Sequence, residues 1–131
     1  MIETPKTICV LDDDVSVLTS IQHLLDSDGL SARTFEHAAD FLAYAARHTV
    51  ALAVLDVWLP EASGLAVQQQ LREVSPGTRV IVMTGQERPG IRDAALAGGA
   101  LAFLVKPFDD EAFIALIRRG LDPGALHTVA P

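Results

Sequence analysis

Residues 51–60 read ALAVLDVWLP, a continuous apolar run that ends in an acidic residue, Asp56. An apolar run of this length, closed by Pro60 and then by a Ser-Gly pair, is typical of a buried parallel strand. Open α/β sheets bind their ligands at the carboxyl ends of the strands, and Asp56 stands at such an end. An aspartate there can also simply begin a turn, so this segment alone leaves both interpretations open.

The N-terminal segment repeats the arrangement. Residues 7–11, TICVL, are mostly apolar and lead directly into Asp12, Asp13 and Asp14. If the two strands are neighbours, Asp12, Asp13 and Asp56 converge, and like charges that close need compensation. A hard divalent cation such as Mg²⁺ prefers oxygen ligands and keeps coordination sites open for phosphate. The competing interpretation of the acidic triplet is a solvated helix start, with Asp14 as the N-cap.

Apolar runs alternate with segments of helical periodicity along the chain. The predicted strands span residues 6–11, 29–35, 51–56, 79–83 and 101–105. The predicted helices span residues 14–28, 37–48, 63–74, 88–98 and 109–120. This strict alternation predicts a doubly wound α/β fold, in which helices cover both faces of a parallel sheet. In the third helix we expect glutamines 68–70 to face solvent.

Composition limits the class of protein. The chain has 131 residues, 50% of them hydrophobic, which fits one globular domain. It contains no run of transmembrane length and no secretory signal, so we expect a cytoplasmic protein. The formal net charge is −7 and no basic stripe is present, so direct contact with nucleic acid is not expected. We expect the domain to span residues 1–121, with residues 122–131 as a tail or the start of a linker.

Polar side chains also close the fourth and fifth predicted strands. Thr84 follows residues 80–83, VIVM, and Lys106 follows residues 101–105, LAFLV. Asp can act as a nucleophile and form an aspartyl phosphate. Phosphoryl transfer to it needs mainly positioning and neutralisation of the moving oxygens, which a cation, an ammonium and a hydroxyl supply. These residues therefore predict that Asp56 receives a phosphoryl group.

Four motifs together resemble the receiver domain of two-component response regulators. They are VLDDD at residues 10–14, LDVWLP at 55–60 with SGL at 63–65, VMTG at 82–85, and FLVKPF at 103–108. The resemblance spans about residues 5–120, and the motifs have the family's order and spacing. It implies a flavodoxin-like sheet of strand order 2-1-3-4-5 with five helices. It also implies a switch rather than an enzyme, phosphorylated by a sensor histidine kinase and assisting its own phosphorylation and dephosphorylation.

The resemblance assigns a role to each site residue. Asp56 would be the phosphoacceptor, and Thr84 and Lys106 would contact the phosphoryl group. The implied Mg²⁺ ligands are Asp13 directly, Asp12 mainly through water, Asp56, and the backbone carbonyl of Trp58. Gly85 would leave room beside the phosphate, and the Lys106-Pro107 peptide bond would be cis.

The resemblance also implies how the signal leaves the site. Thr84 would move toward the phosphoryl group while Phe103 turns inward, which would repack the surface formed by the fourth helix, fifth strand and fifth helix. That surface would support a phosphorylation-dependent homodimer. A plain core role is the competing interpretation of Phe103. Trp58, with Gln86 on the opposite rim, predicts slow loss of the phosphoryl group if the indole shields it from water, although the ring could merely cover the third-helix entry.

The sequence leaves other classes of function open. An aspartyl-phosphate enzyme of the haloacid dehalogenase type would need a second Asp two residues after the nucleophile, and Trp58 stands there. A docking module that is never phosphorylated would not need the acidic residues, Thr84 and Lys106. The motifs are most similar to receivers that precede a helix-turn-helix DNA-binding domain, so we expect part of a transcription regulator. A stand-alone single-domain relay is the alternative.

Overall fold

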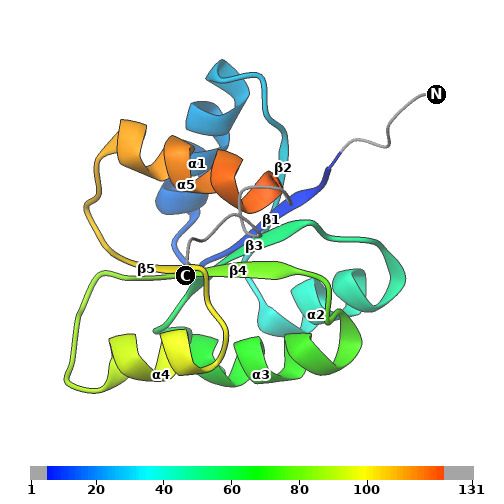
Figure 1. The fold of residues 1–131 in the computed structure, drawn as a ribbon, viewed down its shortest axis with the longest axis vertical. Coiled ribbons are helices and arrows are strands. Elements are labelled where there is room, and N and C mark those ends of the chain that lie inside the picture. The colour runs from blue at the N-terminus through cyan, green and yellow to red at the C-terminus, as the bar shows by residue number, and fades with distance from the viewer. Residues whose placement is uncertain (1–5, 123–131) are drawn as a thin grey trace, which may run out of the picture.

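The computed structural model describes residues 6–122, which form a five-stranded parallel sheet with helices on both faces (Figure 1). The strands are β1 (Ile8–Leu11), β2 (Ala32–Phe35), β3 (Leu52–Asp56), β4 (Arg79–Thr84) and β5 (Ala102–Val105). The helices are α1 (Val15–Ser27), α2 (Ala38–Arg47), α3 (Gly64–Val74), α4 (Ile91–Ala97) and α5 (Asp110–Leu121). The strand order is β2-β1-β3-β4-β5, and the doubly wound α/β prediction is confirmed.

All ten predicted elements are present, and the differences lie at their ends. The fourth helix begins at Ile91 rather than at residue 88, because Gly90 before it adopts a left-handed backbone with φ of 85°. β2 begins at Ala32 rather than at residue 29, because Gly29, with φ of 77°, ends the turn after α1. Of the predicted tail, only Asp122 lies within the described residues.

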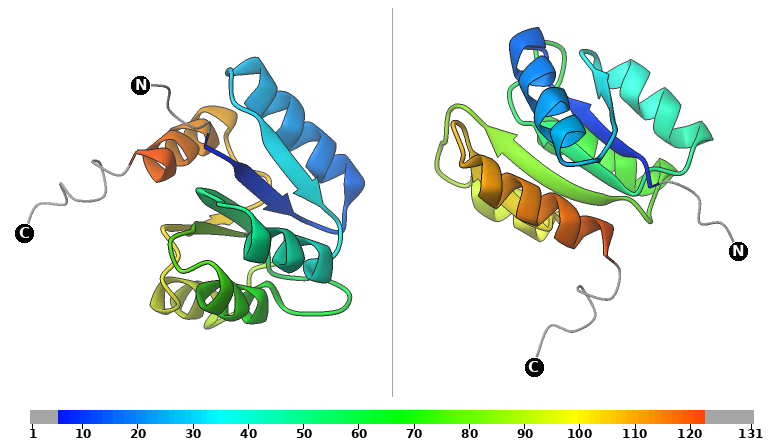
Figure 2. Two further views of the ribbon diagram at one scale, coloured as in Figure 1. Left: turned by 90° about the vertical axis from the view of Figure 1, so that its right-hand side faces the viewer. Right: turned by 90° about the horizontal axis from the view of Figure 1, so that it is seen from above.

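The sheet separates two apolar cores. One lies between the sheet and α2, α3 and α4, with Phe41 and Leu71 among its fully buried side chains. The other lies under α1 and α5 and contains Leu25, Phe113 and Ile117. Figure 2 shows α1 and α5 side by side on their face of the sheet. The central strands β1 and β3 are buried along their whole length, which is why they read as continuous apolar runs.

The expected solvent-facing position of Gln68 is wrong. The residue is 2% exposed, and its side-chain amide donates to the carbonyl of Ala95 in α4 at 2.9 Å. Gln68 lies four residues after Gly64 and three before Leu71, both buried, so it shares the inner face of α3. The hydrogen bond satisfies a buried polar group and ties α4 to α3. Gln69 and Gln70 are exposed, as expected.

Candidate functional site

Three aspartates meet at the carboxyl edge of the sheet. β1 and β3 are adjacent parallel strands in which Leu11 pairs with Leu55. The next residue after each leucine is an aspartate, so Asp12 and Asp56 lie side by side. One carboxylate oxygen from each of Asp12, Asp13 and Asp56 falls within 4.8 Å of the others. Asp12 and Asp56 are 1% and 4% exposed, whereas Asp13 is exposed. The predicted convergence of the three carboxylates is confirmed.

Lys106, at the end of β5, is the counter-charge within this cluster. Its Nζ lies 2.9 Å from Asp12 Oδ2 and 3.2 Å from Asp56 Oδ1, so one ammonium bridges both buried carboxylates. The other oxygen of Asp12 accepts the backbone N–H of Asp14 at 2.9 Å. The peptide bond between Lys106 and Pro107 is cis.

The electrostatics leave one carboxylate poorly compensated. Burial first, and then the negative charge of Asp12, raise the pKa of Asp56 to about 6, and Lys106 only partly opposes both effects. Burial alone would lower the pKa of Lys106, but its hydrogen bond to Asp12 and the charge of Asp56 outweigh burial and raise it. Lys106 therefore stays charged, and the three carboxylates retain a demand for more positive charge.

Side-chain caps fix the starts of the two helices, α1 and α3, that begin next to this cluster. Asp14 is the N-cap of α1, where its side chain accepts the backbone N–H of Ser16. Ser63 caps α3 in the same way through the N–H of Leu65. Gly64 then packs against the end of β3, where an added Cβ would lie 2.1 Å from the backbone oxygen of Asp56. Only glycine allows α3 to begin this close to the phosphoacceptor candidate.

Thr84 ends β4 at the same edge and is fully buried. Its hydroxyl donates to the backbone carbonyl of Gln86 at 2.9 Å and accepts the Gln86 N–H at 3.0 Å. Within the described part of the chain, it makes no hydrogen bond to Asp56 or Lys106. Gly85 lies beside Lys106, since a Cβ there would be 3.6 Å from Lys106 Cε, an ordinary contact. The hydroxyl thus stands at the site with its proton directed elsewhere.

Two aromatic residues flank the site. Phe103 is 6% exposed in the core below α4, and the Arg92 guanidinium lies over its ring at 4.9 Å. Trp58 is 42% exposed at the rim, and its indole N–H donates to the Gln86 carbonyl at 2.7 Å. The expected facing of Trp58 and Gln86 across the rim is present as a hydrogen bond.

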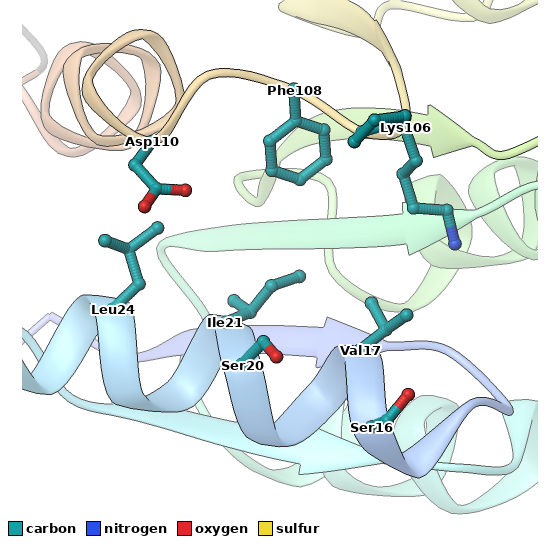
Figure 3. Close-up of a pocket in the computed structure, with 9 residues that line it drawn as sticks. Ser16, Val17, Ser20, Ile21, Leu24, Lys106, Phe108 and Asp110 are labelled. Atoms are coloured by element: carbon teal, nitrogen blue, oxygen red, sulfur yellow. The ribbon is translucent and has the colours of Figure 1, made fainter.

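A groove of about 560 Å³ opens beside the site, between α1 and the loop from β5 to α5 (Figure 3). Val17, Ile21 and Leu24 from α1 face Phe108 across it, and Lys106 stands at one end. The groove therefore combines an apolar floor with direct proximity to the acidic cluster.

The fold and this edge define a receiver-type domain, with acidic residues at the carboxyl ends of β1 and β3 and a lysine directly after β5. The family model described as "Response regulator receiver domain" matches residues 8–118. The chain belongs to the response regulator receiver family, which is not a catalytic family as such.

Curated relatives include regulators of transcription. The chain is 36% identical over 121 residues to response regulator protein TodT of Pseudomonas putida, covering 92% of this chain and 53% of that protein. It is 39% identical over 116 residues to transcriptional regulatory protein FixJ of Azorhizobium caulinodans, covering 88% and 55%. The chain thus spans about half the length of the curated relatives that it matches.

Solved structures agree with the fold. A CheY-like receiver domain protein from Methanospirillum hungatei JF-1 superimposes with a TM-score of 0.87 at 26% identity, covering 95% of this chain and 99% of that one. The beryllofluoride-activated NtrC4 receiver domain dimer gives 0.83 at 30% identity, covering 88% and 95%. None of the helices within residues 6–122 is long and apolar enough to cross a membrane.

Proposed function

We propose that this chain is a phosphorylation-activated switch that takes a phosphoryl group from a histidine kinase onto Asp56. The observation that carries the proposal is the set of three converging carboxylates at the sheet edge, two of which pair with the ammonium of Lys106. In the transfer, a carboxylate oxygen of Asp56 forms a bond to phosphorus as the bond from phosphorus to the donor imidazole nitrogen breaks. Response regulator receivers are phosphorylated by histidine kinases, which supports this donor.

The donor set fits a magnesium ion. Three carboxylates with oxygens within 4.8 Å of one another suit a hard cation, and the exposed Asp13 leaves one side open to water and phosphate. Asp12, Asp13 and Asp56 would hold the ion together with the backbone carbonyl of Trp58. When bound, Mg²⁺ supplies charge neutralisation for the phosphoryl oxygens. The elevated pKa of Asp56 supports the need for that added charge.

Lys106 and Thr84 would receive the new group from the protein side. Lys106 is already within 3.2 Å of Asp56, so its ammonium can pair with a phosphoryl oxygen with little movement. Thr84 would turn its hydroxyl from the Gln86 carbonyl to the phosphoryl group. Phe103 is already buried under α4. An inward turn of this ring on phosphorylation would therefore start from a side chain that is already packed.

The output is proposed to be transcriptional. The transcriptional regulatory protein FixJ and the response regulator protein TodT are each about twice as long as the part that matches this chain, which supports a receiver that works with a DNA-binding domain. The stand-alone relay remains the alternative. A homodimer through α4, β5 and α5 is supported by the activated dimer of the NtrC4 receiver, which resembles this fold. A cytoplasmic location stays a prediction.

The kinase is proposed to dock over the groove between α1 and the loop after β5. Its apolar side chains lie next to Lys106, so a partner seated there brings its phosphohistidine to the acidic cluster (Figure 3). A charge placed in the groove, as in Leu24→Glu, should block transfer from the kinase. It should leave transfer from acetyl phosphate, which needs no docking surface, intact.

The proposal is tested by the rate of phosphorylation with acetyl phosphate as donor. Asp13→Asn should lose most of the rate at limiting Mg²⁺ and regain part of it at high Mg²⁺, because the variant binds the ion more weakly. Lys106→Ala should slow the reaction at every Mg²⁺ concentration. Lys6→Ala is the matched control, because Lys6 binds the Leu121 carbonyl instead of the acidic cluster. Equal rates in Lys106→Ala and Lys6→Ala would contradict the proposed role of Lys106.

A further inference from the structure

Trp58 is a rim residue whose side chain plays no part in the proposed phosphoryl transfer. Its backbone forms a bridge to Ser63, the N-cap of α3, so the residue sits on a well-anchored loop. Its indole N–H nevertheless reaches across the rim to the carbonyl of Gln86, at 2.7 Å. The side chain therefore ties the loop after β3 to the loop after β4.

Thr84 uses the same carbonyl. Its hydroxyl donates to the Gln86 oxygen at 2.9 Å, and a carbonyl oxygen has two lone pairs, so it can accept from Thr84 and Trp58 together. The Thr84 hydroxyl, in contrast, carries a single proton. It cannot donate to Gln86 and to a phosphoryl oxygen at the same time.

Apart from the bond that the Gln86 backbone N–H donates to the Thr84 hydroxyl at 3.0 Å, the loop offers little else to hold Gln86 in place. Residues 85–90 are all exposed, and Gly90 provides no side-chain cap for α4. The ion pair between Glu87 and Arg92 spans 3.6 Å between half-exposed side chains, which makes it weak. Arg88 rests over the Trp58 ring at 5.5 Å, so this second tie also depends on the indole.

Building on the proposed function, we propose that Trp58 is a positioning residue that keeps the Gln86 carbonyl paired while the Thr84 hydroxyl turns to the phosphoryl group. Gln86 is exposed, so water can replace a lost donor, and the state that loses the protein donor gives up only the modest net free energy of one ordinary hydrogen bond. With Trp58 in place, Gln86 O retains one donor after Thr84 leaves, and the loop keeps its position. Trp58 thereby favours the phosphoryl-bound state without touching the phosphoryl group.

A double-mutant cycle on beryllofluoride affinity tests this coupling. Beryllofluoride with Mg²⁺ stands in for the phosphoryl group, and Trp58→Phe keeps an aromatic ring but removes the N–H donor. We expect Trp58→Phe to weaken beryllofluoride binding about fivefold, the factor that corresponds to one ordinary hydrogen bond. In a Thr84→Val background no hydroxyl changes partner, so the same replacement should weaken binding by less than about twofold. An equal loss in both backgrounds would overturn the proposal.

A second measurement needs no ligand. Trp58 is the sole tryptophan, so the protein gives one indole N–H signal in NMR spectra. Thr84→Val removes the competing donor, and the indole proton should move downfield as its own hydrogen bond to Gln86 strengthens. An unmoved signal in a folded Thr84→Val variant would show that the carbonyl is not shared, and would overturn the proposal. If the wild-type protein takes up no beryllofluoride with Mg²⁺, the proposed function fails, and the indole signal still decides whether the carbonyl is shared.

Discussion

Replacing Asp56 by Asn should make the metal-free protein more stable at neutral pH. The Asp56 carboxylate is 4% exposed, and burial together with the charge of Asp12 raises its pKa from 3.8 to about 6. A group whose folded-state pKa is raised stabilises the fold below its unfolded pKa, and this contribution is lost as the pH rises through the folded pKa. Above about pH 6, the ionised Asp56 therefore weighs against folding.

The size of the effect follows from the shift. A rise of the pKa from 3.8 to about 6 corresponds to about 3 kcal/mol. Because solvent and neighbouring groups relax around a charge, we expect the free energy of unfolding of Asp56→Asn to exceed that of the wild type by about 1–3 kcal/mol at about pH 7.5. Asn resembles the protonated carboxyl in shape, so the gain should vanish near pH 4, where wild-type Asp56 carries its proton.

The assay is urea unfolding of both proteins at the two pH values, in EDTA. Asp13→Asn is the matched control, since Asp13 belongs to the same cluster but is exposed, and it should gain much less. Mg²⁺ should then stabilise the wild type more than Asp56→Asn, by about 2.7 kcal/mol at a hundredfold excess over its Kd if the variant does not bind. A variant no more stable than the wild type at neutral pH, or a gain that persists unchanged at pH 4, would refute the reasoning.

Three further predictions concern the metal, the backbone and the rim. Asp13→Asn should weaken Mg²⁺ affinity at least tenfold, measured by calorimetry, since it removes one of three carboxylates; unchanged affinity would exclude Asp13 as a ligand. Gly64→Ala should lower the free energy of unfolding by about 1–3 kcal/mol, because the new methyl group would lie 2.1 Å from the backbone oxygen of Asp56. An unchanged free energy of unfolding in urea titrations would mean that α3 can shift to make room for the methyl group. Trp58→Asn should lose its phosphoryl group faster than the wild type if the indole shields the site, as followed by phosphate release, whereas an equal rate would remove the shielding hypothesis.

The fold could be predicted largely from the order of apolar runs. β1 and β3 are central strands buried on both faces, and their sequences are continuous apolar segments that only such strands and buried helices share. The sequence alone predicts that Asp12, Asp56 and Lys106 lie close together, because the carboxyl ends of parallel strands meet at one edge of the sheet. The element ends were less predictable, since a left-handed glycine such as Gly90 is recognised only by its dihedral angle.

Interactions between distant segments were harder to predict. The polarity of Gln68 predicts a solvent-facing side chain, although its spacing from Gly64 and Leu71 places it on the inner face of α3. The Ala95 carbonyl that satisfies it lies 27 residues away, and no local pattern reveals it. The sequence shows Gly64 only as part of the SGL motif, whereas its close approach to β3, where an added Cβ would lie 2.1 Å from the Asp56 oxygen, depends on how α3 packs. The carbonyl that Trp58 and Thr84 share depends likewise on the path of a loop.

The most direct test of the central claim is the intact mass of the protein after incubation with acetyl phosphate and Mg²⁺. The proposed switch should gain the mass of one phosphoryl group in the wild type. That gain should be absent from Asp56→Asn and from wild type treated in EDTA. A wild-type protein that binds Mg²⁺ but stays unmodified, or an Asp56→Asn variant that is modified equally, would contradict the proposed role of Asp56.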